Sequence, residues 1–492
     1  MSKIVKRKSS IKVNLIYNMI YQIFNIILPL VTAPYITRVI GATNIGIYSY
    51  SQAFANYFYL FAMLGVNNYG NRSIAMVRDD PKKLNQTFWE IFSFQFLIGA
   101  IVSLIYIFYV SIFITSNRFI YILQLFYVLS GMIDINWACF GLEKFKLTAI
   151  RSIIVRLGMT IAVFVFIKDE NDLWIYTLIL SLQYLASVVV VWPFILKHIS
   201  FVKVSWKGII RHIKPNLLLF WPVIAVSLYN IMDKLMLGYI STEKEVAFYT
   251  YAERIISIPT TIILALDNVI MPRMSNLYAT HDNSQATRLM DNVMMFAMFM
   301  SVAMAFGIAG VGESFATWFY GPAFARCGFF LVLLSPTILF KGCAGALRTQ
   351  YIIPTQKDNI YIISLVTGAL VNLCLNALLI PSMSGVGAII GTITAEFSVC
   401  AVQFFMTRKD IPIWKYFSDI IGFIIIGFAM YIVVRLLDGV FATEIVTILV
   451  QIIVGSLVYI ILGAVYMIKI RKNPVLINEG LKMLKIPYQI KW

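Results

Sequence analysis

The sequence predicts an all-α integral membrane protein of about 14 transmembrane helices, arranged as two pseudo-symmetric six-helix lobes around a central cleft, with two extra C-terminal helices. Apolar runs of about 20 residues, enough helix to cross a hydrocarbon core of about 30 Å, follow one another along nearly the whole chain. Hydrophobic residues make up 60% of the 492 residues and charged residues only 13%, unlike the composition of a soluble domain. The two halves of the sequence also resemble each other.

The chain divides into five predicted parts. A basic cytoplasmic N-terminus (1–12) precedes an N-lobe (13–200), a C-lobe (215–408), two further spans (416–468) and a basic cytoplasmic tail (469–492). Each lobe holds six spans. The predicted spans are 13–35, 44–66, 87–113, 119–140, 152–167, 173–196, 216–237, 246–270, 289–311, 327–347, 359–380, 386–407, 416–435 and 445–468.

Charge predicts the orientation. Lysines and arginines gather in every second connection between spans, and the positive-inside rule places those connections and both termini in the cytoplasm. The net charge of +17 therefore reflects topology, with attraction to anionic lipids of the inner leaflet as a side effect. The basic N-terminus leads into an apolar run without a small-residue cleavage site, so we expect a retained first helix rather than a signal peptide.

Several classes of function are excluded by what the sequence lacks. The five cysteines are scattered singly in or beside apolar runs, and the three histidines lie in polar connections, so no metal site or cofactor is expected. No phosphate-binding GxxxxGK[ST] motif occurs, and no connection is long enough for a catalytic domain, so the chain is not expected to be an enzyme. The positive charges are spread over short loops, which argues against nucleic acid as a partner.

The internal repeat relates the first six spans to the next six. Ile47-Tyr48-Ser49-Tyr50 is echoed about 200 residues later by Phe248-Tyr249-Thr250-Tyr251, with the same separation of the tyrosines. Because six is an even number, both copies enter the membrane in the same direction, and an axis along the membrane normal should relate them. Two such lobes would leave a cleft between them, while spans 416–435 and 445–468 have no repeat partner.

Several motifs resemble one family. These are Pro34-Tyr35-Ile36-Thr37-Arg38-Val39-Ile40-Gly41, Leu64-Gly65-Val66-Asn67-Asn68-Tyr69-Gly70-Asn71-Arg72, Asp134-Ile135-Asn136-Trp137, Asp233-Lys234-Leu235-Met236-Leu237-Gly238 and Met271-Pro272-Arg273-Met274-Ser275. In this order they closely resemble the polysaccharide repeat-unit flippases, the Wzx-type branch of the multidrug/oligosaccharidyl-lipid/polysaccharide exporter superfamily. The resemblance covers essentially the whole chain.

The resemblance implies transport of undecaprenyl-pyrophosphate-linked oligosaccharide from the cytoplasmic to the outer leaflet of a bacterial cell membrane, for capsule, O-antigen or teichoic-acid-type glycans. It implies alternating access and, as further partners, the polysaccharide polymerase and chain-length proteins of the pathway. The leading alternative is a cation-coupled multidrug antiporter of the same superfamily. The sequence leaves the driving force open, including whether H⁺ or Na⁺ is a coupling ion.

Ionisable residues inside spans are the candidates for the cargo site, because a charge at mid-bilayer costs about 2.5–3.5 kcal/mol and usually faces a partner or a wet cavity. Arg38, Lys234 and Arg254 lie near outer ends of spans. They either snorkel to the interface or form a cationic wall for the pyrophosphate.

Lys341 lies deeper in its span, and the repeat places it level with Asp134. We expect Lys341 to face the cleft opposite Asp134. Aromatic residues beside these positions are candidates for stacking on sugars, and charged residues at the cytoplasmic mouth are candidates for a gate. The stacking candidates are Tyr48, Tyr50 and Trp137, and the gate candidates are Arg72, Glu143, Arg151, Arg273 and Arg348.

Overall fold

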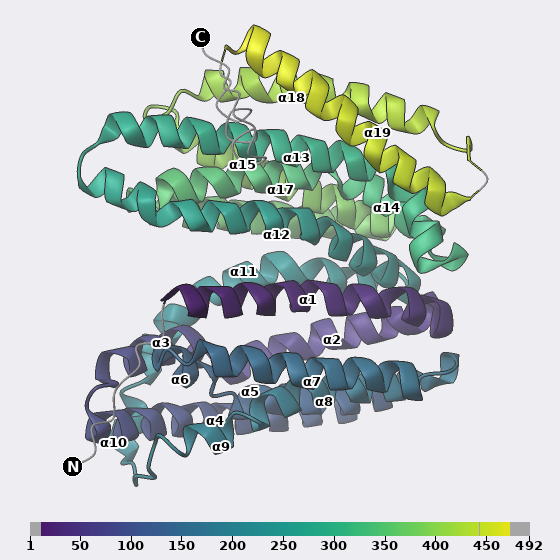
Figure 1. Cartoon of the computed structure of the whole chain (residues 1–492). Coiled ribbons are helices and arrows are strands. Elements are labelled where there is room, and N and C mark those ends of the chain that lie inside the picture. The colour runs from purple at the N-terminus through teal and green to yellow at the C-terminus, as the bar shows by residue number, and fades with distance from the viewer. Residues whose placement is uncertain (1–10, 442, 473–492) are drawn as a thin grey trace. The chain divides into compact units, whose positions relative to one another are not determined.

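The computed structural model describes residues 11–441 and 443–472, and every regular element in these ranges is a helix (Figure 1). The chain forms two compact units, the first ending at Ile231 and the second beginning at Met232. We call them unit 1 and unit 2. The dividing point lies inside one helix, α11, which therefore contributes residues to both units.

Unit 1 is a bundle in which α5 packs against α2, α4 and α8, and α1 packs against α7. The chain enters α4 through Asp80, whose carboxylate accepts hydrogen bonds from the backbone N–H groups of Lys82 and Lys83, while Pro81 occupies the first helical position. The helices are α1 (Ile11–Val39), α2 (Gly41–Met63), α3 (Val66–Val77), α4 (Pro81–Phe113), α5 (Arg118–Ile133), α6 (Asn136–Gly141), α7 (Phe145–Phe166), η1 (Glu170–Asp172), α8 (Leu173–Val189), α9 (Trp192–Ile195), α10 (Trp206–Ile210) and α11 (Ile213–Ile240).

Unit 2 is built around α13, which packs against α12, α14, α15, α18 and α19. Thr242 and Asp282 cap the first turns of α12 and α13 with their side chains. The helices are α12 (Glu243–Ala279), α13 (Asn283–Tyr320), η2 (Pro322–Phe324), α14 (Ala325–Leu334), α15 (Pro336–Leu347), the π-helical turn η3 (Arg348–Ile352), α16 (Asp358–Met383), α17 (Gly385–Thr407), α18 (Ile413–Leu436), α19 (Glu444–Val465) and the π-helical turn η4 (Tyr466–Ile470).

Nine helical stretches of the described residues are long and apolar enough to cross a membrane, or ten if the bent pair α14 and α15 forms one span. They confirm the all-helical membrane fold. The other four predicted spans fall on α1, α2, α7 and α11. Polar residues such as Ser49, Ser51 and Gln52 on α2 lower the mean hydropathy of that helix. The number fourteen therefore stays a prediction.

Two predicted spans are broken helices. Span 119–140 is interrupted at Asp134 and Ile135, between α5 and α6. Span 327–347 is interrupted at Ser335, and the helix axis bends by 43° between α14 and α15. Pro336 accounts for the second break, because proline removes a backbone hydrogen bond and clashes with the preceding turn.

The same pairs of spans pack together in both units, as the predicted repeat requires. The pairs α2 with α4, α2 with α5 and α7 with α8 in unit 1 correspond to α12 with α13, α12 with α14 and α16 with α17 in unit 2. The echoed tyrosines follow this correspondence. Tyr48 packs on Tyr176 of α8, and Tyr249 bonds to Thr392 of α17. The predicted axis and central cleft stay predictions.

The position of the five cysteines in or beside apolar runs predicts small buried side chains, and the structure corrects this for two of them. Cys139, Cys327 and Cys343 are buried, whereas Cys400 is half-buried and Cys374 lies on the exposed side of α16. A helix exposed to lipid carries apolar side chains on its outer face as well, so hydropathy does not separate this position from the interior.

Candidate functional site

Lys341 forms an ion pair within unit 2. Its ammonium on α15 lies 3.1 Å from the carboxylate of Glu396 on α17, and the lysine side chain is 30% exposed while the glutamate is 6% exposed. The pair therefore has one side buried among helices and one side open. A charge exposed in this way can exchange its carboxylate partner for another anion.

Lys234 forms a second ion pair in the same unit. Its ammonium, near the C-terminal end of α11, lies 2.7 Å from the carboxylate of Glu253 on α12, and the two side chains are 22% and 30% exposed. The adjacent Arg254 places its guanidinium 4.7 Å from the centre of the Tyr251 ring, a cation–π contact. Adjacent residues on a helix point about 100° apart, so Lys234 does not pair with Asp233 and Arg254 does not pair with Glu253. Each of these side chains contacts a residue farther along the chain or on another helix.

Asp233 is the centre of a buried polar cluster. Its Oδ1 accepts hydrogen bonds from the side-chain amides of Asn372 and Asn376 on α16, at 2.9 and 2.5 Å. Its Oδ2 accepts one from the Tyr249 hydroxyl and lies 2.9 Å from the Thr392 hydroxyl. One carboxylate thus sits among four side chains that all carry oxygen, and the Oδ1 of Asn376 is buried without a hydrogen-bond partner among the described residues.

The side chains around Asp233 can both donate and accept hydrogen bonds. Each asparagine amide carries a nitrogen donor and an oxygen acceptor, so rotating the amide changes which of the two faces the carboxylate.

Asp134 lies in a different environment in unit 1. It is 6% exposed at the break between α5 and α6, and its carboxylate accepts hydrogen bonds from the backbone N–H of Asn136, at 2.8 Å, and the hydroxyl of Tyr59, at 3.2 Å. Arg151, a predicted gate residue, is 7% exposed and donates to the side chain of Asn136 at 2.9 Å. The cluster fixes the broken helix rather than presenting charge at a surface.

Trp137 is fully buried, with none of its surface exposed. Its indole N–H lies 2.9 Å from both the Gln95 side-chain oxygen and the Asp134 backbone carbonyl, and its ring packs on Phe88. Gly70 lies against the ring so closely that an added Cβ would come within 2.6 Å of it. In this structure Trp137 is a core residue.

The remaining cargo candidates Arg38, Tyr48 and Tyr50 lie on α1 and α2 of unit 1, and their role stays a prediction. Tyr48 is buried against Tyr176, and Tyr50 is half-buried with its ring edge-on to that of Tyr121. Arg38, in the last turn of α1, is exposed and donates to the carbonyl of Pro34 at 2.9 Å. These contacts belong to unit 1 alone.

The gate candidates occupy several surfaces. Arg72 on α3 and Arg273 on α12 are exposed. Glu143 pairs with Arg78 at 2.6 Å, largely in the open. Arg348 begins the π-helical turn η3 and lies over the ring of Tyr361, and such turns are frequent at functional sites.

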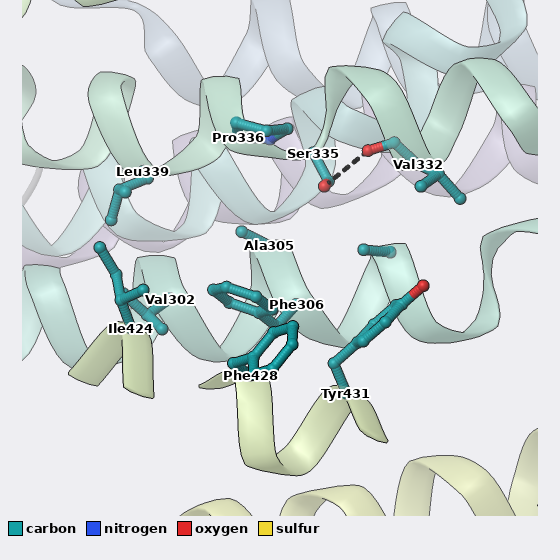
Figure 2. Close-up of a pocket in the computed structure, with 11 residues that line it drawn as sticks. Val302, Ala305, Phe306, Val332, Ser335, Pro336, Leu339, Ile424, Phe428 and Tyr431 are labelled. Atoms are coloured by element: carbon teal, nitrogen blue, oxygen red, sulfur yellow. Dashed lines mark hydrogen bonds between the residues drawn. The ribbon is translucent and has the colours of Figure 1, made fainter. Parts of the chain in front are cut away.

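A separate pocket of about 300 Å³ lies in unit 2 between α13, α18 and the break between α14 and α15 (Figure 2). In Figure 2, Ser335 and Pro336 face Phe428 and Tyr431 across it, and the Ser335 hydroxyl donates to the carbonyl of Val332. None of the predicted site residues lines this pocket. Its other lining residues are apolar, namely Val302, Ala305, Phe306, Ala309, Val332, Leu339 and Ile424. These walls offer no charge to a phosphate.

Sequence reasoning missed the acid that pairs with Lys341. Glu396 lies inside predicted span 386–407, so the rule that selects ionisable groups within spans would have found it. Asn372 and Asn376 are neutral and follow each other at helical spacing, which gives no signal by composition. Only the fold brings them to Asp233.

The sequence matches a model of one family, described as polysaccharide biosynthesis protein, over residues 11–278. A candidate O-antigen transporter of Escherichia coli strain K12 is 23% identical over 410 residues, which are 82% of this chain and 98% of that protein. A second one, from Shigella dysenteriae, is 23% identical over 71% of this chain and 88% of its own length.

The fold is similar to that of solved transporters. The lipid II flippase MurJ in an inward closed conformation gives a TM-score of 0.73 at 16% identity, covering 93% of this chain and 99% of its own. An inward-facing multidrug resistance transporter of the MATE family of the MOP superfamily gives 0.60 at 13% identity, covering 80% of this chain and 97% of its own.

Proposed function

The chain belongs to the polysaccharide biosynthesis protein family, and on that premise we propose that it flips undecaprenyl-pyrophosphate-linked oligosaccharide repeat units from the cytoplasmic to the outer leaflet of the cell membrane. It is a multi-pass membrane transporter and not an enzyme, in keeping with its relatives. The glycan under assembly is of the O-antigen, capsule or teichoic-acid type.

One observation carries the proposal, namely the partly exposed ion pair of Lys341 and Glu396. A pyrophosphate diester carries two negative charges that are costly in a low-dielectric layer. When the cargo enters, its phosphate replaces the carboxylate of Glu396 as the partner of the lysine. Lys234 and Arg254 share the remaining charge, while the polyprenyl chain stays in lipid. When the cargo leaves, Glu396 takes the lysine back.

Asp233 is the proposed site of a coupling ion. Its cluster lies next in sequence to Lys234, so occupation of the cluster by H⁺ or Na⁺ changes the field felt by that lysine and its partner Glu253. Release of the ion on one side of the membrane then favours one arrangement of Lys234 and Glu253. Replacing Asp233 with Asn should uncouple transport from the ion gradient without removing Lys341.

The arrangement in the cell follows from the charge pattern. Both termini lie in the cytoplasm, and anionic lipids surround the basic loops of that side. The polysaccharide polymerase and chain-length proteins of the same pathway take up the product on the outer side.

The proposal is tested by locating the cargo in cells depleted of this protein. We expect lipid-linked oligosaccharide to accumulate on the cytoplasmic leaflet while its synthesis continues, as measured by leaflet-selective labelling of the sugar. Normal arrival of the sugar outside would contradict the proposal. Drug sensitivity with normal glycan would instead support the multidrug antiporter.

A further inference from the structure

Residues 197–212 connect the sixth predicted span to α11 and expose large apolar side chains. Phe201 and Trp206 are 76% and 64% exposed, and Ile210 is exposed as well. Within a span such side chains would face lipid tails, but these three lie outside the predicted spans. Exposed aromatic and aliphatic residues just beyond a span are typical of the membrane interface, where they contact headgroups and the upper part of the lipid chains.

The same connection carries positive charge without negative charge. It holds four basic residues, Lys197, Lys203, Lys207 and Arg211, whereas no aspartate or glutamate occurs from 173 to 232. Arg211 bonds to an acid on α4, but Lys203 and Lys207 are exposed and pair with no acid in the described part of the chain. Basic clusters beside the end of a membrane helix attract anionic lipid headgroups.

Unit 1 holds the first part of this connection against α4. Both backbone groups of Ser200 are bonded there: its N–H donates to the side-chain oxygen of Asn85 at 3.1 Å, and its carbonyl accepts from the indole N–H of Trp89 at 3.0 Å. The rings of Trp89 and Phe201 also pack edge to face, with 5.0 Å between their centres. Phe201 is therefore exposed beside a residue whose backbone is fixed.

The second part of the connection contains α10, which packs against α4 with one face and is exposed on the other (Figure 1). The Ser205 hydroxyl caps this helix by accepting from the backbone N–H of Gly208 at 3.2 Å. Gly208 lies directly against the side chain of Glu90 on α4. Trp206 and Ile210, one helical turn apart, are exposed. The fold thus presents an apolar face outward in a defined position.

The corresponding connection of unit 2 has a different charge. Residues 408–412 between α17 and α18 hold two basic residues, Arg408 and Lys409, followed by Asp410, which pairs with Lys357 at 2.7 Å. The next residue, Ile411, is buried. Of the two connections, only that of unit 1 combines exposed apolar side chains with cations that no acid interrupts, so the repeat alone does not account for this combination.

We propose that residues 197–210 form a binding surface for anionic phospholipids of the adjacent leaflet. The exposed apolar side chains enter the interface, and Lys203 and Lys207 bind the phosphate of the headgroup as point charges. A free phosphate would use the lysines but would leave Phe201 and Trp206 in water. Because the surface lies directly beyond the end of a span, a phospholipid reaches both features at once. The assignment goes beyond the proposed function and does not depend on the cargo.

The surface is tested by hydrogen exchange of the purified full-length protein in a neutral detergent, titrated with phosphatidylglycerol. We expect exchange of residues 200–210 to slow as this lipid is added, and to respond less to phosphatidylcholine with the same chains, which has no net charge. Lys203→Gln together with Lys207→Gln should need about thirtyfold more phosphatidylglycerol for the same protection. Added salt should weaken the response of the wild type, which provides a test without any substitution.

The matched control is Lys168→Gln together with Lys244→Gln, which removes the same charge from exposed positions elsewhere. It should need an amount of phosphatidylglycerol within about twofold of the wild type. Trp206→Ser should weaken the response as well, because it removes an apolar contact. Equal responses of the two double variants, equal protection by the two lipids, or full protection by inorganic phosphate alone would overturn the surface. Because no step measures transport, failure of the surface and failure of the proposed function are distinguishable.

Discussion

The two units carry different polar arrangements in the fourth span of each repeat, which is broken into α5 and α6 in unit 1 and into α14 and α15 in unit 2. At Asp134, unit 1 surrounds a carboxylate with neutral donors, and the neighbouring Trp137 is fully buried. At Lys341, unit 2 holds a cation against Glu396 with almost a third of the lysine side chain exposed. The two units share the packing of their helices but differ in the polar residues that these two helices carry.

This difference teaches how a duplicated transporter divides its tasks. A buried carboxylate that is satisfied by the backbone and a hydroxyl fixes a broken helix in place. A lysine that is paired with a buried carboxylate but is itself partly exposed stays available to a charged ligand. Changes in the unit 1 cluster should therefore alter the amount of folded protein, whereas changes in the unit 2 pair should alter transport per molecule.

The largest effect is expected for Trp137→Ala, which tests the structural half of the comparison. Removing a fully buried indole leaves a cavity and one unpaired acceptor, the side-chain oxygen of Gln95, at a cost of about 3–5 kcal/mol of stability. We expect the membrane level of the protein to fall strongly, with export per remaining molecule preserved. Quantitative blotting beside glycan export measures both. A normal protein level with lost export would instead favour the role in sugar stacking.

Lys341→Met tests the other half of the comparison, the ion pair of Lys341 and Glu396 in unit 2. Loss of a charge-assisted contact of about 1.5–3 kcal/mol predicts roughly a 10-fold to 100-fold decrease of export at normal protein level. The single variant also leaves the carboxylate of Glu396 buried without its cation. Lys341→Met with Glu396→Gln removes both charges and serves as the control, which should fold like the wild type and still fail to export. Recovery of export in the double variant would show that the lysine only neutralises Glu396.

The smallest effect concerns pH and His212, which lies between α10 and α11 beside the carboxylate of Glu90 on α4. Burial lowers the pKa of His212 below its usual 6.5, assisted by Arg211 and opposed by Glu90, while Tyr69 faces the other ring nitrogen. A histidine with a lowered pKa in the folded state binds its proton more readily when unfolded, so stability is complete above about pH 6.5 and declines as the pH falls below it. Thermal unfolding between pH 5 and 8 should show this decline, and His212→Gln should flatten it. An equal slope in the variant would assign the dependence to other groups.

The helices were predictable from the sequence because hydropathy and span length fix them directly. The repeat was readable from Tyr48 and Tyr249, which keep equivalent neighbours in the structure. The break at Pro336 also has a sequence signal. The break at Asp134 has none, because neither a proline nor a glycine stands there.

The candidate site was predictable only in part. Lys341 and Lys234 stand out because charge is rare within spans, yet their partners lie on other helices, and pairing across a fold is invisible to local pattern. Trp137 is fully buried in this structure, and its predicted contact with sugar stays a prediction, because composition does not distinguish an aromatic residue that packs in a core from one that lines a cavity. The Asp233 cluster was missed because its partners Asn372 and Asn376 are neutral and lie on another helix, so the local sequence gives no signal for them.

Reconstitution of the purified protein in vesicles tests the central claim, transport of an anionic lipid-linked sugar, most directly. Undecaprenyl-pyrophosphate-linked oligosaccharide is placed in one leaflet, and its appearance in the other is followed with a sugar-specific probe, beside uptake of a cationic dye as the antiporter control. We expect protein-dependent movement of the lipid-linked sugar, loss of that movement in Lys341→Met, and no uptake of the dye. Dye uptake without movement of the lipid-linked sugar would contradict it.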